Sequence, residues 1–503
     1  MKVVNLGDLI DPSKDLGKIA LIDLHHPEAP REWSYAAIDD TARAVARLLS
    51  RRGFVRGSRV AILGLNRAAY VAAYFGIMRA GLVAVPVNSK LPRPTMNLII
   101  EDAGAVLAFA DGARTGDVPS GVPVINFDDQ GPEGFARQLD PGPFPTCCPT
   151  PGEVAEILYT SGSTGRPKGV LLSHGSQIWG LEQRRDMSGG EAARYIVAAP
   201  LFHMNGLFNT KLSFFTHASM VLLPSFTTHG YVEAIGRWRV TALTSVPTML
   251  ARITKEAELL ARTDLSSVRR VRMGSAPLTQ SLVERVQAVF ENATVSNGYG
   301  ATEGGPAVFG PHPEGIPTPP GSVGYPLPDG EVKLVEGSNE NEGVLLMRNA
   351  GMMSGYHNLP EATKKVMRDG WYYSGDVMRY DENGFFYFLG RADDMFVCSG
   401  ENIYPGEIEK MLERHQAIHQ ACVVPLPDEE RGHVPVAFIV PRPGMTVAPD
   451  EVKRFALANA PAYQHPRRIA LLDELPWAGT DKIDRRALIE RAAVLERSLG
   501  WAR

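Results

Sequence analysis

The chain has 503 residues, more than one hydrophobic core usually organises, so the sequence predicts two or three domains. Its 52 lysines and arginines against 56 aspartates and glutamates leave a net charge of −4, without long runs of like charge. This balance argues against a nucleic-acid partner and favours a small-molecule ligand. The start, "MKVVNLGDLIDPSKD", lacks a signal-peptide core, and Arg79 interrupts the longest apolar stretch, so we expect a cytoplasmic protein without a membrane span.

The elements alternate along the chain between strand-like and helix-like segments. "SRVAILG", "NRAAYVAAYFGIMRAG" and "LVAVPVN" come first, and "MVLLPSF", "YVEAIGRWRV" and "TALTSVP" follow later. This alternation is typical of βαβ units and predicts mainly parallel sheets. Further on, "LTQSLVERVQAVF" predicts an amphipathic helix that covers a sheet with one face, made of Leu278, Leu282, Val286, Val289 and Phe290.

Two breaks divide the chain. The Pro/Gly-rich segment 139–153, "LDPGPFPTCCPTPGE", is expected to separate an early βα region from a second one. Its Cys147 and Cys148 are interpreted as linker residues, and with Cys398 and Cys422 they form no disulfide or metal pattern. After "GRADD" the chain changes to short strands and helices, which predicts a separate α+β domain of roughly 110 residues. The predicted fold class is α/β, with a large body of mainly parallel βα sheets at 1–390 and a small C-terminal α+β domain at 391–503.

The segment Tyr159–Gly169, "YTSGSTGRPKG", predicts a phosphate-binding loop. Its glycines let a backbone approach an anion, its hydroxyls donate hydrogen bonds, and Lys168 adds a positive charge. The spacing does not match the Walker A pattern, because Gly169 and not a hydroxyl residue follows Lys168. The strand-like flanks "EVAEILY" and "GVLLSH" favour a structured loop over a flexible linker.

Five further motifs follow this loop: "GYGATEGG" (298–305), "YYSGDV" (372–377), "GRADD" (390–394), "SGENIYPGEIE" (399–409) and "GTDKIDR". In this order, and across nearly the whole chain, they resemble the acyl-adenylate-forming superfamily of acyl-CoA and aryl-CoA ligases. The resemblance implies an enzyme that activates a monocarboxylic acid with ATP and Mg²⁺ as acyl-AMP, releases pyrophosphate, and transfers the acyl group to coenzyme A.

The resemblance assigns the nucleotide and the metal to named positions. Tyr299 and Gly300 are expected at the adenine, Thr302 at the α-phosphate, Asp376 at the ribose, and Arg391 at the ribose or a phosphate. Glu303 and Thr164 are expected to hold Mg²⁺. The loop residues expected at the ATP phosphates are Thr160, Ser161, Gly162, Ser163, Thr164, Gly165 and Lys168.

The same resemblance assigns catalysis to Lys482, Thr302, Glu303 and His203. Lys482 is expected to bridge the substrate carboxylate and the α-phosphate, and His203 to gate the thiol tunnel or help to deprotonate the thiol. Asp481 stands before Lys482, where the family often has glycine, which weakens the transfer of regulation by lysine acetylation and leaves that question open.

Two half-reactions at one carbonyl carbon need different groups, and in the resembled family the C-terminal domain rotates as a mobile cap between them. Asp393 matches the hinge position. The positions expected at coenzyme A are Ser399 and Gly400 for the pantetheine tunnel and Arg431, Tyr463 and Arg467 for the nucleotide.

The acid is expected between residues that are mostly small. By resemblance they are His203, Asn205, Phe208, Met273, Gly274, Gly298, Ala301, Gly304 and Gly305. The space left by the glycines and the apolar surface of Phe208 and Met273 favour a flat aromatic or phenylpropenoic acid. A medium-chain fatty acid fits almost as well, and the absence of a basic residue from this set argues against dicarboxylic acids.

Alternative functions remain open. One is a stand-alone adenylation enzyme that loads a carrier protein in trans, and another is a luciferase-like monooxygenase. A third, non-enzymatic alternative is an acyl-nucleotide sensor, against which the intact Lys482, Glu303 and Asp376 count. The sequence leaves a monomer and a homodimer equally open.

Overall fold

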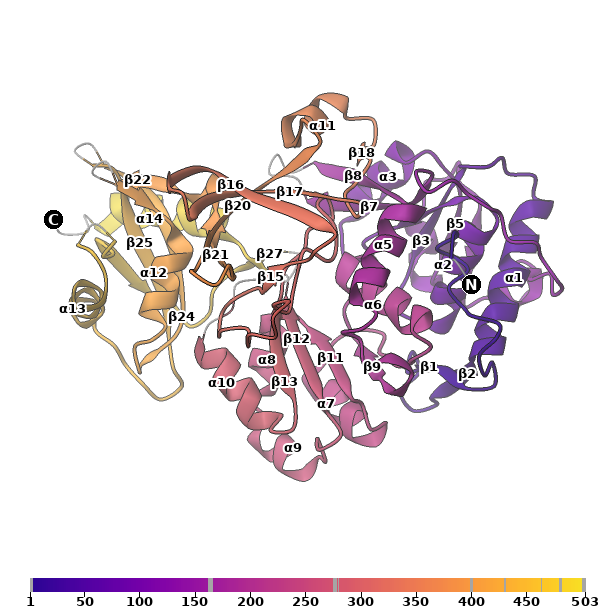
Figure 1. Ribbon diagram of the computed structural model, residues 1–503, viewed down its shortest axis with the longest axis horizontal. Helices are drawn as coiled ribbons and strands as arrows, with labels where there is room; N and C mark the ends of the chain where they lie inside the picture. Colours follow the sequence, from indigo (N-terminus) through magenta and orange to yellow (C-terminus); the bar gives the residue numbers. More distant parts are fainter. Residues whose placement is uncertain are drawn as a thin grey trace.

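The computed structural model describes residues 3–161, 166–274, 278, 280–398, 401–428, 431–462, 464–478 and 482–499. It shows a large body, which carries the N-terminus, and a smaller C-terminal unit at one side (Figure 1). Among the described residues, no helix is both long enough and apolar enough to cross a membrane.

The first sheet of the body runs in the order β18-β8-β7-β4-β3-β5-β6. Its strands β3 to β7 pair in parallel, whereas β7 with β8 and β8 with β18 pair antiparallel. The bounds are β3 Arg59–Leu63, β4 Val83–Pro86, β5 Ala105–Ala110, β6 Val124–Asn126, β7 Val154–Ser161, β8 Pro167–Ser173 and β18 Gly355–Tyr356.

The second sheet runs in the order β13-β12-β11-β9-β10-β1-β2. All its pairs are parallel except the edge pair β1 with β2. The bounds are β1 Ile19–Asp23, β2 Arg31–Ser34, β9 Arg194–Val197, β10 Ser219–Leu222, β11 Ala242–Ser245, β12 Arg270–Gly274 and β13 Thr294–Gly298.

Helices cover both faces of these sheets, as strands with two buried faces require. Buried residues alternate along the strands: Val60 and Ile62 face a central cluster, and Ala61 and Leu63 face the cluster beneath α3. Helices α1, α2, α5 and α6 fill the central layer, and α7 to α10 cover the outer face of the second sheet. The helices are α1 Tyr35–Arg51, α2 Ala68–Arg79, α3 Arg93–Asp102, α4 Phe135–Gln138, α5 His174–Arg184, α6 Met204–Phe215, α7 Thr228–Arg237, α8 Pro247–Ile253, α9 Ala257–Arg262 and α10 Gln280–Val289.

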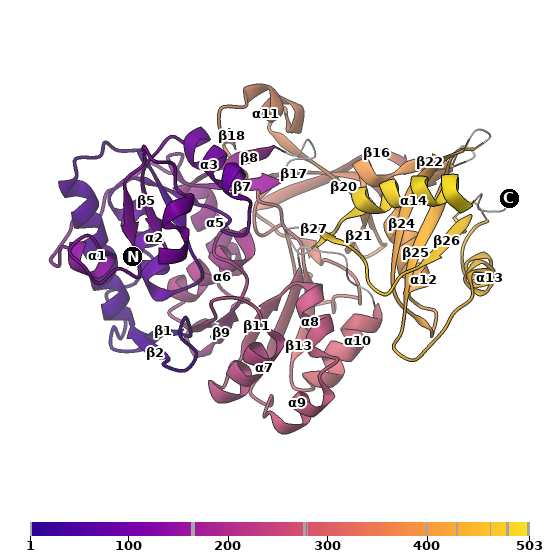
Figure 2. The same ribbon diagram turned by 180° about the vertical axis from the view of Figure 1, so that it is seen from behind.

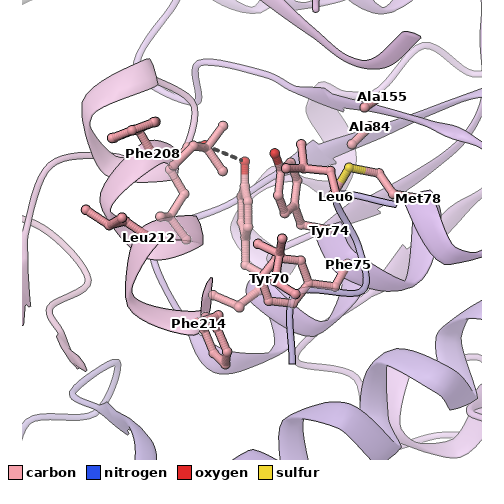
Figure 3. Close-up of a cluster of buried hydrophobic side chains, with 14 of the residues drawn as sticks. Leu6, Tyr70, Tyr74, Phe75, Met78, Ala84, Ala155, Phe208, Leu212 and Phe214 are labelled. Carbon is pink, nitrogen blue, oxygen red and sulfur yellow. Dashed lines mark hydrogen bonds between the residues drawn. The ribbon is translucent and has the colours of Figure 1, made fainter. Parts of the chain in front are cut away.

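The predicted amphipathic helix is α10. Leu282, Val286 and Phe290 are buried in the cluster on the outer face of the second sheet, with Leu278 beside them and Val289 packed against it. Figure 3 shows the central layer, where Tyr70, Tyr74 and Phe75 of α2 meet Phe208, Leu212 and Phe214 of α6. The middle of the body is thus an aromatic core that fixes α6 between the two sheets.

The expectation that segment 139–153 separates two βα regions is wrong. Strands β7 and β8 follow this segment but extend the early sheet through β4, and the N-terminal β1 crosses to pair with β10 of the second sheet. The segment itself packs on the body: the amide of Cys147 donates to the carbonyl of Arg79, and the Asn5 side chain donates to the carbonyl of Cys147. Parallel pairing joins strands that lie far apart in the sequence, so a proline-rich connection does not mark a sheet boundary.

The C-terminal third begins with an antiparallel sheet, followed by the smaller unit, which has its own buried cluster from Phe396 to Ala492. This mixed α/β architecture confirms the predicted fold class. The antiparallel strands are β14 Phe309–Gly310, β15 Tyr325–Pro326, β16 Gly330–Asn339, β17 Glu342–Asn349, β19 Met367–Arg368, β20 Trp371–Tyr380 and β21 Phe386–Arg391, with helix α11 Pro360–Val366. The smaller unit holds β22 Phe396–Cys398, β23 Glu401–Ile403, β24 Ile418–Asp428, β25 Gly432–Pro441, β26 Arg468–Leu471, β27 Trp477–Ala478, β28 Lys482–Ile483, α12 Pro405–Leu412, α13 Pro449–Asn459 and α14 Arg485–Leu499. Short 3₁₀ helices are η1 Gly112–Asp117, η2 Gly190–Ala192 and η3 Ala392–Asp394.

Candidate active site

The end of β7 meets the segment that follows β13. Thr160 Oγ1 donates to Glu303 Oε1 at 3.3 Å, and the Tyr356 hydroxyl donates to the same oxygen at 3.2 Å. Lys168, opposite Thr160 on β8, lies over the Tyr356 ring with its Nζ 5.3 Å from the ring centroid. The structure therefore brings together three residues predicted for phosphate and metal: Thr160, Lys168 and Glu303. Gly162, Ser163, Thr164, Gly165 and the Ser161 side chain lie outside the described residues.

The Glu303 carboxylate meets hydroxyl groups, and within the described part of the chain no cation pairs with it. Burial first, and then the Glu303 charge, raises the pKa of the Tyr356 phenol, so this hydroxyl stays a neutral donor. A tight turn holds Glu303, with Ala301 and Gly305 exchanging backbone hydrogen bonds and Gly305 at a φ of +104°. A carboxylate with neutral donors is a suitable ligand for a hard cation such as Mg²⁺.

Asp376 lies at the centre of a second group of predicted nucleotide residues. Its Oδ2 accepts from the Tyr299 hydroxyl, and its Oδ1 accepts from Arg391 Nη1 at 2.8 Å. Burial lowers the pKa of Arg391, but the Asp376 and Asp393 carboxylates outweigh it and hold that pKa above its usual value. Gly300, beside Tyr299, is exposed. These residues form a charged edge suited to a ribose and a phosphate.

The predicted acid-binding residues gather between α6 and the ends of β12 and β13. His203 immediately precedes α6, and Asn205 accepts hydrogen bonds from Asn209 of α6 and from Thr244 beside it on β11. Gly274 and Gly298 are register partners on β12 and β13. Parallel strands present their carboxyl ends to ligands, so this is the expected edge.

Other predicted residues of this set are more enclosed. Gly304 is buried, and a Cβ added there would lie 2.5 Å from Met347 Sδ and 2.8 Å from Tyr372 Cδ1. The Phe208 side chain is buried in the central cluster (Figure 3), and Met273 is fully buried in the cluster shared with α8 and α10. Both side chains therefore lie behind the candidate site and expose little or no surface to a bound acid. Ala301 and Thr302 remain partly exposed beside Glu303.

Sequence reasoning missed Arg272. Val271 and Met273 face the outer cluster, so the two-residue period of β12 turns Arg272 to the opposite face together with Gly274. A Cβ added at Gly298 would lie 2.6 Å from both Nε and Nη2 of Arg272. The alternation around Gly274, which was in the predicted set, was a signal that could have found this arginine.

The C-terminal unit contributes its predicted residues from two sides. Strand β27, the partner of β28, reaches toward the body, whereas β22 lies at the outer part of the unit (Figures 1 and 2). Lys482 pairs with Ala478 in this hairpin, but its side chain lies outside the described residues, as do Ser399, Gly400 and Tyr463. Asp393 is exposed in η3, which connects β21 to β22.

Arg467 and Arg431 form a basic pair in the C-terminal unit. Burial first, and then the charge of Arg431, lowers the pKa of Arg467. Arg467 Nη1 contacts His465 Nε2 at 2.9 Å, and its buried Nε has no hydrogen-bond partner among the residues placed by the structure. A phosphate group would supply negative charge to offset the two arginines and an oxygen acceptor for Arg467 Nε.

Comparisons with known proteins agree with this geometry. The family model described as "AMP-binding enzyme" matches residues 12–357, and the model "AMP-binding enzyme C-terminal domain" matches residues 407–482. The chain is 34% identical to feruloyl-CoA synthase of Amycolatopsis sp, over 88% of this chain and 91% of that protein. It is 30% identical to the fatty acid–[acyl-carrier-protein] ligase ScoC of Streptomyces coeruleorubidus, over 93% and 94% of the two chains.

The fold also matches a solved structure of the anthranilate CoA ligase AuaEII in complex with anthranoyl-AMP. The TM-score is 0.88 at 25% identity, and the match covers 98% of both chains. The family model alone covers well over half of the chain, and the resemblance drawn from the six motifs is confirmed. The chain belongs to the family of AMP-binding enzymes, within the acyl-adenylate-forming superfamily.

Proposed function

We propose that this protein is an AMP-forming CoA ligase that converts an aromatic or phenylpropenoic monocarboxylic acid to its CoA thioester. The family and the CoA-ligase relatives support the reaction class. The observation that carries the proposal within this chain is the meeting of Thr160, Lys168 and Glu303 beside the Asp376–Arg391 pair. A hard-cation ligand, a phosphate-binding cation and a ribose acceptor are the groups that ATP requires.

In the first half-reaction, Lys168 and the loop around it neutralise the phosphates, and Asp376 accepts from the ribose hydroxyls. Lys482 supplies the positive charge for the α-phosphate and the attacking carboxylate, and Thr302 donates to that phosphate. Glu303 and Thr164 would hold Mg²⁺, which would supply positive charge to neutralise the phosphates. His203 lies at the start of α6, where it can contact the acid or the incoming thiol.

For the second half-reaction we propose that the C-terminal unit, residues 391–503, rotates about Asp393 as a cap on the body at 1–390. Its separate buried cluster supports movement as a unit, because this core can move with the unit without being opened. Strand β27 faces the body in the present arrangement, whereas β22, which leads to Ser399 and Gly400, faces away. Rotation would move Lys482 away from the acyl-adenylate and bring Ser399 and Gly400 to it, where they would line the pantetheine tunnel.

A pair of variants tests this rotation. Lys482→Ala should abolish adenylation but spare the transfer of presynthesised acyl-adenylate to CoA. Gly400→Leu should leave the first-turnover release of pyrophosphate intact and block thioester formation, because a side chain would obstruct the tunnel. Loss of the same half-reaction by both variants would contradict the rotating cap.

Loading of a carrier protein is the second candidate, and the similarity to ScoC favours it. Both acceptors carry pantetheine, but only coenzyme A carries a nucleotide with phosphates. The basic pair Arg431 and Arg467 therefore supports coenzyme A. Arg467→Ala should raise the KM for coenzyme A without changing the rate of adenylation.

The reaction itself is tested by its products. Purified protein with ATP, Mg²⁺ and a panel of aromatic, phenylpropenoic and medium-chain acids should form AMP and pyrophosphate, and thioester should appear only when coenzyme A is added. Formation of ADP and orthophosphate would overturn the adenylate mechanism. Transfer to a carrier protein in preference to coenzyme A would show that the acyl acceptor is a carrier protein.

A further inference from the structure

Two arginines, Arg184 and Arg272, place positive charge beside the predicted acid site without a carboxylate to neutralise it. Arg184 ends α5, is 4% exposed, and donates from Nη2 to the Phe309 carbonyl at 3.1 Å. Its Nη1 contacts Met187 Sδ at 3.6 Å. In the part of the chain that the structure describes, neither arginine forms an ion pair with an acidic side chain.

Arg272 has the more direct relation to the acid. It lies on the face of β12 that looks into the layer of α5 and α6, and its guanidinium covers Gly298. Gly298 and Gly274 approach closely, since a Cβ on Gly274 would lie 2.8 Å from the Gly298 carbonyl oxygen. The glycines thus leave room for a guanidinium at the strand ends where the acid is expected.

The surroundings of these groups are unfavourable for charge. Burial lowers the pKa of Arg272 to about 10. Burial first, and then the charge of Arg272, lowers the pKa of Arg184 well below its usual value. The Tyr195 phenol also acts on Arg272, but it donates to the Ser188 carbonyl at 2.7 Å, and burial raises its pKa to about 12, so the phenol is neutral. Among the residues that the structure describes, no anion offsets the two charges.

Two fully buried cations, Arg79 and Lys211, and the partly buried Arg485 each have an acidic partner in the described structure. Arg79 binds Asp39 at 2.6 Å, Lys211 binds Glu156 at 2.7 Å, and Arg485 binds Glu409 at 2.8 Å. A buried charge without a partner is strongly unfavourable, and a ligand that supplies the opposite charge removes that penalty on binding. The unpaired arginines therefore mark a place where the ligand completes the charge balance.

We infer that the acid carries a second acidic oxygen, remote from the carboxylate that is activated, and that Arg272 binds this oxygen while Arg184 strengthens the positive field around it. The inference rests on the proposed function and narrows its substrate class to acids with an ionisable hydroxyl or a second carboxylate at the far end. It revises the expectation that the site holds no basic residue for a second acidic group.

A matched series of acids tests this inference on the wild-type protein. Cinnamic acid with hydrogen, methyl, hydroxyl or carboxyl at the ring position opposite the propenoate gives four substrates of similar shape. The hydroxyl or the carboxyl acid should exceed the methyl acid at least 30-fold in kcat/KM for AMP formation. The preferred of these two acids identifies whether Arg272 binds a phenolic oxygen or a carboxylate. Equal kcat/KM for the methyl acid and both oxygen acids would overturn the inference and leave the proposed function standing. Absence of AMP with every acid of the panel would overturn the proposed function and the inference with it.

Variants locate the effect. Arg272→Met should lower kcat/KM for the preferred acid about 100-fold, mainly through KM, and leave the methyl acid and the KM for ATP within threefold. Arg272→Lys should recover part of the loss because it restores the charge. Arg270→Met removes an exposed arginine from the same strand and should change neither acid. A uniform loss with all acids in both Arg272 variants would show a structural role and overturn the assignment.

A spectroscopic readout is independent of turnover. A phenolic acid bound near a guanidinium should ionise at lower pH, so its ultraviolet band should shift toward that of the phenolate on binding. The shift should disappear in Arg272→Met. An unshifted band in the wild type, combined with a preference for the phenolic acid, would exclude Arg272 as the group that recognises the hydroxyl.

Discussion

The buried ion pair between Lys211 of α6 and Glu156 of β7 is neutralised within the fold, whereas two charged residues of the candidate active site are not neutralised by any residue that the structure describes. In the core, Lys211 Nζ lies 2.7 Å from Glu156 Oε1 and 2.8 Å from Gln177 Oε1, and the Tyr74 hydroxyl donates to the second oxygen of Glu156. All four residues are almost fully buried. In the candidate site, Glu303 and Arg272 have no oppositely charged partner within the described residues.

The comparison separates charges that organise the protein from charges that await a ligand. The Lys211–Glu156 pair joins β7, which leads into the phosphate loop, to α6, which begins after His203. It is complete without any ligand. Glu303 and Arg272 are completed only by a cation and an anion from outside, so substitutions should damage stability in the first region and ligand binding in the second.

The largest expected effect comes from breaking the core pair. Lys211→Met leaves the Glu156 carboxylate buried without a cation and should lower the free energy of unfolding by about 3–5 kcal/mol, measured from the first transition in urea. The double variant Lys211→Met/Glu156→Gln should recover much of the loss because it removes the stranded charge. A single variant that loses less than about 1 kcal/mol would show that this pair is not a structural element.

A buried histidine shows a third solution, in which the fold keeps an ionisable group neutral. His174 Nδ1 accepts from the Leu6 amide at 3.0 Å, and burial lowers the pKa of the imidazole to about 4. In the unfolded chain, His174 therefore takes up a proton near pH 6.5, whereas in the folded chain it stays neutral down to about pH 4. The contribution of neutral His174 to the free energy of unfolding should be fully present above pH 6.5 and should fall by about 3 kcal/mol as the pH drops to 4.

The measurement is the free energy of unfolding between pH 4 and 7 for the wild type and for His174→Gln, whose amide oxygen can still accept from Leu6. The difference between the two curves isolates this histidine from His419, whose pKa burial also lowers to about 4. Parallel curves would show that His174 takes up its proton in the folded state without penalty.

On the active-site side, Glu303→Gln should lower the rate of adenylation roughly 100-fold, which corresponds to about 2.7 kcal/mol. The neutral amide keeps the hydrogen bonds from Thr160 and Tyr356 but removes the charge that suits Mg²⁺. Excess Mg²⁺ should restore only part of the rate, measured as pyrophosphate release. Glu314→Gln, at an exposed glutamate, is the control, and an unaltered rate at low Mg²⁺ in Glu303→Gln would show that Glu303 is a turn residue.

The smallest expected effect distinguishes the two regions most sharply. Arg272→Met removes a partly buried cation, whereas Lys211→Met removes a fully buried one, and the loss of Arg272 strands no anion among the described residues. The free energy of unfolding of the ligand-free protein should therefore change by less than about 0.5 kcal/mol or rise. Destabilisation by several kcal/mol would mean that Arg272 has an anionic partner within the fold and belongs with Lys211.

The sequence predicted the residues that carry local signals. The strand runs, the amphipathic face of α10 and the glycine-rich turn before Glu303 depend on neighbours in the chain, and the structure contains each of them. Arg272 was within reach as well, because the period of β12 places it with Gly274. The interpretation by resemblance followed known motif positions and passed over a residue that lies between them.

Other features depend on contacts that no local pattern encodes. Lys211 has the sequence context of an ordinary helical lysine, and only the packing of α2, α5 and β7 around α6 buries it beside Glu156. Arg184 meets the Phe309 carbonyl across 125 residues of chain. The Pro/Gly-rich segment gave the wrong division for the same reason, since strand order in a parallel sheet follows long-range pairing.

The position of β1 has a consequence for the synthesis of the chain. Leu21 pairs with Met220, so the N-terminal strand must wait for about 200 further residues before its parallel partner exists. A ribosome that adds roughly 5–20 residues per second needs about 10–40 s for that distance. During this interval the "IALID" segment can pair with β2 on one side but keeps its other edge unpaired, and such an apolar edge is a site where a chaperone would protect the nascent chain.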